Sequence, residues 1–394
     1  MDILQISPYN IYPPNTGGDE RSHGLVYPLV SSDIDVIRYC TNGLATKVYE
    51  SMTDGNLRLR RCFTHDGVVE HQPNNLILDI PSAGGFVLFP QLRLYLASRL
   101  LHHYFPQKLR SLCEWADVIF VERPWFVRTI AEKTDAVIIY SAHDVPTDLY
   151  DSILDDRFGH RLFLQKVEEI EAKAVSAADL VITVSEADLD RYQEKYNFLS
   201  ETLVIPNSVQ DAKFESGPRN NNSSDGADAV FVGSDRQPNI EAVETLIEMT
   251  EEIIDDHPNF SLSLVGDVAA NFNQDSYDYL TTVGYVEELV PTLASYDLAL
   301  NPVVTGGGSN IKLIDYCAAG LPIISTEFGV RGFDFVSDTH LLIRELSKFP
   351  SAISYLLENP DERARLAKKG YQHARTCYTW ESHAETLRKR VSEM

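Results

Sequence analysis

The stretch DLALNPVVTGGGSNIKLIDYCAAGLPIIST, residues 297–326, contains the pattern that decides the fold. Both of its ends are short apolar runs, which are typical of strands buried on both faces of a parallel sheet. Between them, three consecutive glycines lead into an amphipathic segment that ends at a further Gly. The order of strand, glycine loop, helix and strand indicates one unit of a doubly wound α/β domain.

The same alternation runs along all 394 residues. Strand-like runs in the first half are DILQIS, DVIRYC, DVIFVE, AVIIYSAHD, DLVITVS and TLVIPN, and those in the second half are AVFVGS, FSLSLVG, DLALNPV and LPIIST. A polar stretch rich in Gly, Pro, Asn and Ser separates the two series. We therefore predict an α/β protein with two Rossmann-like doubly wound domains facing a central cleft. The expected divisions are 1–208, a linker at 209–228, a second domain at 229–377, and a C-terminal helix at 378–394 that could cross back to the first domain.

Composition excludes several classes of function. The formal net charge is −24, which disfavours binding to a nucleic-acid backbone. No apolar run approaches the roughly 20 residues of a spanning helix, and the first residues read as a strand rather than a signal peptide. The five cysteines form no CxxC pair, which indicates a reducing, cytoplasmic compartment and argues against a zinc site or a disulfide framework. We expect no metal and no cofactor. The spread acidic residues fit two interpretations, a haloarchaeal protein adapted to salt or simply an acidic protein.

The glycine loop at 306–308 predicts an anion site. Glycines let backbone N–H groups approach a ligand closely, and a helix predicted to begin near Ser309 directs its positive end at the loop. Lys312 would add a point charge for a diphosphate, and Asp315 could accept hydrogen bonds from two ribose hydroxyls. The alternative is a glycine-rich turn beside two solvated charges. The chain has no GxxxxGK[ST] and no GxGxxG after its first strand, which argues against a P-loop NTPase and a dehydrogenase.

This segment resembles the nucleotide-sugar signature of GT-B glycosyltransferases of family 4, the glycosyl transferases group 1. That family carries a Glu, seven residues and a second Glu. Here the second acid falls on Asp315, and the first falls on Gly307, as in a variant branch with a Gly-rich loop followed by Lys. The stretch VFVGSDRQPNIEAV (230–243) also resembles this branch. The resemblance implies a donor diphosphate at Arg236, Gly307, Gly308, Ser309 and Lys312, and a ribose at Asp315.

The first half resembles the same family. The stretch SPYNIYPPNTGGDERSHGL (7–25) is similar to its N-terminal Gly-Gly loop, which implies that Gly17 and Gly18 face the donor diphosphate and that Arg21 adds charge. The stretch VIIYSAHDVPTDLY is similar to a strand end that bears a histidine toward the sugar, here His143. The alternatives are a Pro/Gly turn and a structural histidine.

The resemblance implies a retaining glycosyltransferase that moves a sugar from a nucleotide-diphosphate sugar to a glycan or lipid-linked acceptor in cell-surface glycan or glycoprotein biosynthesis. The chemistry needs no nucleophilic side chain, because Lys312 and the glycine loops would stabilise the leaving diphosphate. Lys312 and His143 are the catalytic candidates. Two alternatives stay open: a GT-B-fold sugar-nucleotide epimerase and a non-catalytic GT-B scaffold subunit.

One basic and aromatic segment contrasts with the acidic chain. Residues 84–112, GGFVLFPQLRLYLASRLLHHYFPQKLRSL, contain no acidic residue and include Arg93, Arg99, Lys108 and Arg110. This composition suits an amphipathic segment at the inner face of the cell membrane. The alternative is a buried helix pair with basic ends.

Overall fold

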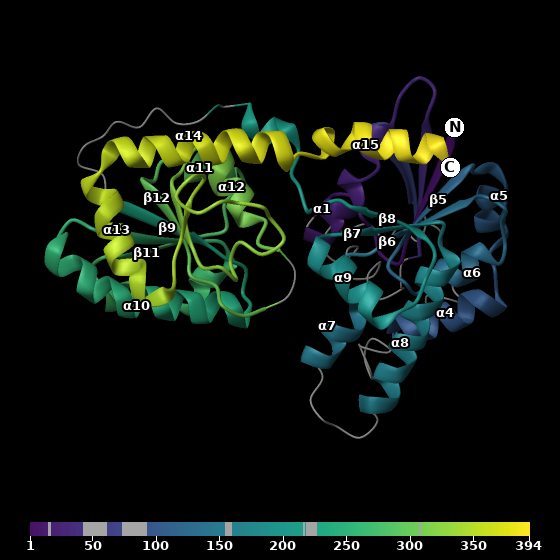
Figure 1. The fold of residues 1–394 in the computed structure, drawn as a ribbon, viewed down its shortest axis with the longest axis horizontal. Coiled ribbons are helices and arrows are strands. Elements are labelled where there is room, and N and C mark those ends of the chain that lie inside the picture. Colours follow the sequence, from purple (N-terminus) through teal and green to yellow (C-terminus); the bar gives the residue numbers. More distant parts are fainter. Residues whose placement is uncertain are drawn as a thin grey trace. The chain divides into compact units, whose positions relative to one another are not determined.

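The computed structural model describes residues 1–14, 17–41, 61–72, 93–153, 160–215, 217, 227–306 and 309–394. The chain divides into two compact units, Met1–Pro206 with Ala384–Met394 (unit 1) and Asn207–His383 (unit 2) (Figure 1). The prediction of an α/β protein with two Rossmann-like units is confirmed. Part of the expected linker at 209–228 belongs to unit 2 instead, because Val209 and Phe214 are buried in the core of that unit.

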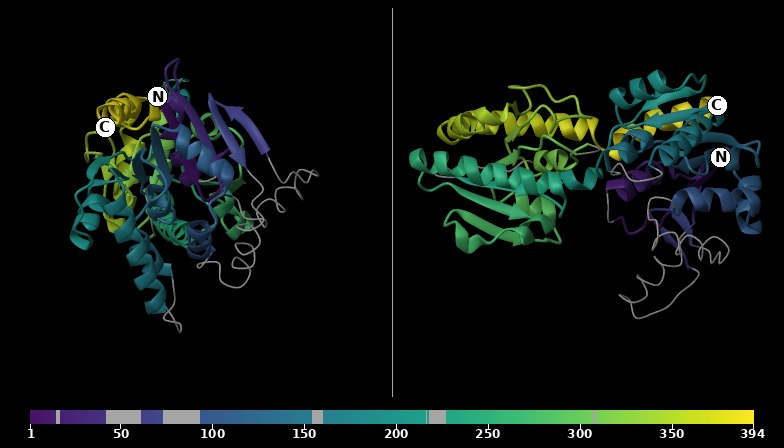
Figure 2. Two further views of the ribbon diagram at one scale, coloured as in Figure 1. Left: turned by 90° about the vertical axis from the view of Figure 1, so that its right-hand side faces the viewer. Right: turned by 90° about the horizontal axis from the view of Figure 1, so that it is seen from below.

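Unit 1 contains an eight-stranded sheet in the order β3-β4-β2-β1-β5-β6-β7-β8. Its strands are β1 (Asp2–Ser7), β2 (Asp35–Cys40), β3 (Arg61–His65), β4 (Val68–Gln72), β5 (Val118–Glu122), β6 (Val137–Ser141), β7 (Leu180–Thr183) and β8 (Glu201–Val204). Every neighbouring pair is parallel except β3 with β4, which form an outer edge of the sheet (Figure 2).

The helices of unit 1 cover this sheet because its strands are apolar on both faces. They are α1 (Gly17–Gly24), α4 (Arg93–His103), α5 (Gln107–Trp115), α6 (Val127–Ala131), α7 (Pro146–Ile153), α8 (His160–Ala177), α9 (Glu186–Lys195) and most of α15 (Trp380–Glu393). Alternate residues of β1 and β5, such as Leu4 and Ile119, pack with α4, α5, α6 and α8 in one core. No helix in the described ranges is both long and apolar enough to cross a bilayer.

A buried polar network crosses the middle of this sheet. Arg38 of β2 donates through Nε to Gln5 Oε1 (2.6 Å) and through Nη1 to Glu70 Oε2 (2.8 Å). Gln5 in turn donates to Glu122 Oε1 (2.6 Å). The parallel register pairs Gln5 with Arg38 and Arg38 with Glu70, and Glu122 lies two residues beyond the register partner of Gln5 on β5. All four side chains are essentially unexposed. Because a buried charge must be paired, this network holds Glu122 at the carboxyl end of β5 in one orientation.

Unit 2 contains a six-stranded parallel sheet in the order β11-β10-β9-β12-β13-β14. Its strands are β9 (Asp228–Val232), β10 (Ser261–Val265), β11 (Leu280–Gly284), β12 (Leu298–Asn301), β13 (Ile323–Ser325) and β14 (Leu342–Ile343). Its helices are α10 (Gln237–Asp256), α11 (Leu289–Leu293), α12 (Lys312–Ala318), α13 (Phe349–Glu358) and α14 (Pro360–Cys377). Helices α10 and α13 lie on one side of the sheet, and α11, α12 and α14 lie on the other (Figure 1). Strands β10 and β11 lie on one side of β9, and β12, β13 and β14 lie on its other side, so the strand order reverses between β9 and β12.

The buried network predicts a large stability effect at Arg38. We expect Arg38→Met to lower the free energy of unfolding by about 3–5 kcal/mol, because it leaves Glu70 buried without a cation. Urea unfolding monitored by tryptophan fluorescence measures this. The control is Arg390→Met, which removes a surface ion pair with Glu201 and should cost no more than about 1 kcal/mol. Equal costs for the two variants would contradict the role of the network.

Candidate active site

The reversal point of the unit 2 sheet carries the predicted diphosphate site. In doubly wound sheets, ligands bind outside the carboxyl ends of the strands at this point. Helix α10 begins just after β9, and Lys312 begins α12 after β12. Gly306 has φ +112, and a Cβ there would lie 3.1 Å from Cγ of Pro238 in the first turn of α10. The loop after β12 therefore packs closely against the start of α10, and glycine is required at this position.

Lys312 lies at the centre of this site. It is the first residue of α12, so the helix begins later than the predicted start near Ser309. Its Nζ donates to Oδ1 of Asn239 (2.9 Å) and lies 4.1 Å from the centre of the Phe231 ring. No carboxylate in the described part of the chain pairs with it, and burial lowers its pKa to about 7. A half-buried amine that contacts an amide oxygen and an aromatic face is suited to bind an anion.

The other residues of unit 2 that were predicted to bind the donor differ in exposure and in the partners they already have. Arg236 occupies the N-cap of α10 and is exposed. Asp315 is 6% exposed and forms an ion pair with Nζ of Lys213 (2.7 Å). Oγ of Ser309 accepts a hydrogen bond from Nδ2 of Asn207 (2.8 Å). Gly307 and Gly308 lie outside the described residues. The ligand roles of these residues remain predictions.

The sheet of unit 1 reverses between β1 and β5, and a pocket of about 70 Å³ lies there. Gly18 and Ser22 of α1 line it, together with Glu122, Arg123 and His143 from the ends of β5 and β6. The structure therefore brings the predicted Gly18 and His143 together. Gly17, the first residue of α1, does not line this pocket.

His143 is held by Glu122. Its Nε2 lies 2.6 Å from Oε2 of Glu122 and 3.4 Å from Oγ of Ser22. Its buried Nδ1 makes no hydrogen bond with the residues that the structure describes. Burial, with the nearby charge of Arg123, lowers the pKa of His143 despite the raising effect of Glu122. Burial alone would raise the pKa of Glu122, but hydrogen bonds from His143 and Gln5 bring it below its usual value. Both lowered pKa values fit a neutral imidazole whose Nε2–H donates to an ionised Glu122 carboxylate. In this tautomer Nδ1 is an acceptor.

Two arginines surround this pocket in different ways. Arg123 has φ +73, a left-handed conformation that non-glycine residues rarely adopt, and its Nη1 donates to Oδ2 of Asp144 (2.8 Å). Arg21 is 1% exposed, and its Nη1 donates to the backbone oxygen of Ile205 (2.8 Å). Burial lowers the pKa of Arg21 to about 10. Arg21 also contributes to the lowered pKa of His143, so its charge acts on the pocket from within the fold.

Comparison with known protein families now assigns unit 2. Residues 226–359 match the family described as glycosyl transferases group 1, and this span contains both Asn239 and Lys312. This match lies within residues 226–359 and supports a group 1 glycosyltransferase. The chain is an enzyme of the glycosyltransferase class. A search of curated proteins finds no match to the chain.

Solved structures show the fold of the transferase. The sucrose-phosphate synthase of Thermosynechococcus elongatus aligns with a TM-score of 0.71 at 16% identity, covering 100% of this chain and 99% of that chain. The Anabaena protein Alr3699/HepE in complex with UDP aligns with a TM-score of 0.66 at 13% identity, covering 100% of both chains. A UDP-forming α,α-trehalose-phosphate synthase from Burkholderia xenovorans aligns with a TM-score of 0.64 at 12% identity, covering 99% of both chains. The transferase therefore has the GT-B fold.

Sequence reasoning missed several residues of these sites. Asn239 lies in the quoted stretch 230–243, but only the fold shows that it accepts the hydrogen bond of Lys312. Glu122 ends an apolar strand, and an acidic residue at a strand's carboxyl end was a usable signal. Arg331 donates to the backbone oxygen of Gly306 (3.1 Å) from a loop distant in sequence, which no local pattern indicates.

The environment of Lys312 predicts its titration in the free transferase. We expect its amine to be half-protonated near pH 7, because burial penalises the ammonium form. An ordinary lysine has a pKa of about 10.4. Competitive acetylation across a pH series, with peptide mass spectrometry, measures this midpoint. The control is Asn239→Leu, which removes the amide oxygen and should lower the midpoint further. A wild-type midpoint near the ordinary value would contradict the burial argument.

Proposed function

We propose that the transferase moves a sugar from a nucleotide-diphosphate sugar to a glycan or lipid-linked acceptor, with retention of anomeric configuration. The observation that supports this most is the ammonium of Lys312, which has no carboxylate partner in the described chain and lies at the reversal point of the unit 2 sheet. The Anabaena neighbour was solved with UDP and with UDP-glucose. That finding supports a UDP-sugar as the first donor to test.

In this proposal, unit 2 binds the donor nucleotide. The diphosphate contacts Lys312, Arg236 and the loop at 306–309, where amide N–H groups add to the charge of the side chains. Asp315 accepts from the ribose hydroxyls, and its ion pair with Lys213 holds the carboxylate in place. The negative charge of the diphosphate would thus lie beside the side chains of Lys312 and Arg236.

Unit 1 would contribute from its own pocket. Gly17 and Gly18 bring the start of α1 toward the diphosphate, and Arg21 adds positive potential from its buried position. His143 would face the transferred sugar at the end of β6, and Glu122 holds its ring in place.

The proposed step balances without a protein nucleophile. The bond between the anomeric carbon and the phosphate oxygen breaks, and its electron pair stays on the diphosphate. The acceptor oxygen bonds to the anomeric carbon on the same face, and its proton passes to the departing phosphate oxygen. Lys312 stabilises the charge that develops on the leaving group, which is the largest contribution expected of the protein. Exclusion of water would limit hydrolysis of the donor.

Binding of UDP should depend on pH through Lys312. A diphosphate favours the ammonium, so above pH 7 binding must take up a proton, and we expect affinity to fall by up to about tenfold per pH unit. Isothermal titration calorimetry between pH 7 and 9 measures this. The matched control is Lys312→Arg, which stays charged and should bind with little dependence on pH. The same slope in both proteins would exclude Lys312 from the diphosphate site.

Turnover should depend on the same cation. We expect Lys312→Ala to lower kcat/KM by at least about tenfold, since a charged contact to the leaving group is worth more than about 1.4 kcal/mol in the transition state. Released nucleotide diphosphate, assayed with and without acceptor, measures turnover. Transfer requires release that depends on acceptor, whereas donor turnover without acceptor would contradict the proposed reaction. Unchanged kinetics would remove Lys312 from the mechanism.

We also propose peripheral contact with the inner face of the membrane through 84–112. Residues 84–92 lie outside the described residues, and α4 and α5 form the remainder. Lys108 and Arg110 are exposed on α5, and Arg110 lies over the ring of Phe105 (5.6 Å). We expect the double variant Lys108→Glu/Arg110→Glu to reduce co-sedimentation with anionic vesicles. Each basic residue close to an anionic membrane surface adds about 1 kcal/mol to the free energy of binding. Unchanged binding by this folded variant would end this part of the proposal.

A further inference from the structure

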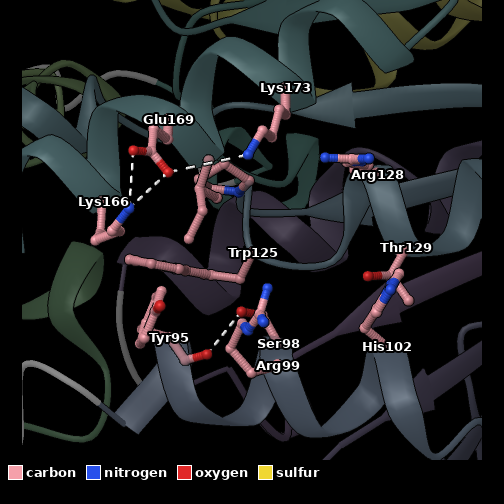
Figure 3. Close-up of a pocket in the computed structure, with 12 residues that line it drawn as sticks. Tyr95, Ser98, Arg99, His102, Trp125, Arg128, Thr129, Lys166, Glu169 and Lys173 are labelled. Atoms are coloured by element: carbon pink, nitrogen blue, oxygen red, sulfur yellow. Dashed lines mark hydrogen bonds and ion pairs between the residues drawn. The ribbon is translucent and has the colours of Figure 1, made fainter.

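A second pocket of unit 1, with a volume of about 360 Å³, lies between α4, α6 and α8 (Figure 3). Helix α8 supplies Lys166 and Lys173 on one side, and α4 supplies Arg99 on the opposite side. The side chain of Trp125 lies between them. None of these residues belongs to the donor site proposed above.

The charge of this pocket is opposite to that of the chain. The chain has 58 acidic and 34 basic side chains, yet the basic residues that line the pocket are Arg99, Arg128, Lys166 and Lys173, with Glu169 as its carboxylate. Glu169 lies 2.8 Å from Nζ of Lys166 and 4.0 Å from Nζ of Lys173, and Arg128 pairs with Glu132. No carboxylate in the described part of the chain pairs with Arg99. The cations therefore exceed their counter-charges, and their mutual repulsion favours a bound anion.

The remaining walls are suited to a polyhydroxylated ligand. Trp125 is 5% exposed, and its ring packs edge-on against Tyr150 with centres 6.1 Å apart. This contact makes the indole a rigid wall rather than a mobile side chain. The hydroxyl of Thr129 also lines the pocket (Figure 3). An aromatic wall and a hydroxyl beside several cations fit a phosphorylated sugar better than a bare inorganic ion.

The connection between β5 and α6 links this pocket to that of His143. Glu122 and Arg123 line the His143 pocket, and the next two residues, Pro124 and Trp125, line the basic pocket. Consecutive Cα atoms are about 3.8 Å apart, so the two pockets lie on either side of a short piece of backbone. The left-handed conformation of Arg123 turns the chain between them.

We propose that the basic pocket binds the phosphate group of a phosphorylated acceptor. This inference rests on the proposed transferase function, because it names the chemical class of the acceptor. A phosphate monoester carries nearly two negative charges and offers three strong acceptor oxygens, which match several cations at once. Its source is either a soluble sugar phosphate or the head group of a phosphorylated lipid, and the experiment separates the two.

The test uses the whole 394-residue chain and the fluorescence of Trp125 as a local reporter. Glucose 6-phosphate and glucose form one pair of probes, and vesicles of phosphatidylcholine with and without phosphatidic acid form the other. The test variant is Arg99→Glu/Lys173→Glu. Its matched control is Lys133→Glu/Lys389→Glu, which makes the same change in net charge at exposed residues of unit 1 outside the pocket. Calorimetric binding of UDP is measured for every protein.

We expect a saturable fluorescence change with a phosphate probe and none with its neutral counterpart. The test variant should weaken this binding by at least about tenfold, because two attractive charges become repulsive, while the control binds as the wild type does. Trp125→Phe should abolish the signal. A response to glucose 6-phosphate identifies a soluble acceptor, and a response only to phosphatidic acid identifies a lipid head group.

Three results would overturn the inference: no response to either phosphate probe, equal responses to glucose and glucose 6-phosphate, or equal weakening in the test and control variants. Binding of UDP reports on the donor proposal independently. UDP binding without a phosphate response removes the acceptor pocket alone. A phosphate response without UDP binding removes the donor proposal and leaves a phosphate-binding pocket that is not assigned to an acceptor.

Discussion

The hydrogen bond from Lys312 to Asn239 is the contact on which the proposed donor site depends. It holds an amine at the mouth of a parallel sheet, where burial disfavours its charged form and no carboxylate in the described residues compensates it. A salt bridge at this position would have satisfied the cation and closed the site. An amide oxygen orients the amine without neutralising it, so the charge remains available for a ligand. The close packing of Gly306 against Pro238 keeps the loop in the position that this geometry requires.

Unit 1 organises its pocket by a different physical device. Its polar groups are satisfied in a chain from Glu70 through Arg38 and Gln5 to Glu122, and the last of these holds His143. Each contact crosses from one strand to the next, so the orientation of the imidazole depends on the register of the whole sheet. Such a network is costly to bury, and its complete pairing makes the position of His143 well defined. Unit 2 differs: in unit 1 a carboxylate orients a neutral histidine, whereas in unit 2 an amide oxygen orients the amine of Lys312.

The short connection that follows β5 gives unit 1 a second functional surface. It passes from the His143 pocket to the basic pocket within four residues, and the left-handed Arg123 makes this reversal possible. A rigid scaffold that bears binding residues on its connections is the usual arrangement in α/β folds. The chain as a whole is acidic, so the cluster of basic residues between α4, α6 and α8 is a favourable place for an anion to bind.

The sequence by itself determined the α/β class, the two successive series of strands and the glycine loop before Lys312. These features are local, since burial of strands on two faces and the freedom of glycine are written in short stretches of chain. It also indicated Lys312 and His143, because both follow strand ends. The partners of these residues were decided only by the tertiary structure. Asn239 meets Lys312 because β9 and β12 are neighbours, and Glu122 meets His143 because β5 and β6 are neighbours. Strand order is set by packing between distant segments. For that reason, neither the lack of a carboxylate beside Lys312 among the described residues nor the basic pocket could be seen before the chain was folded.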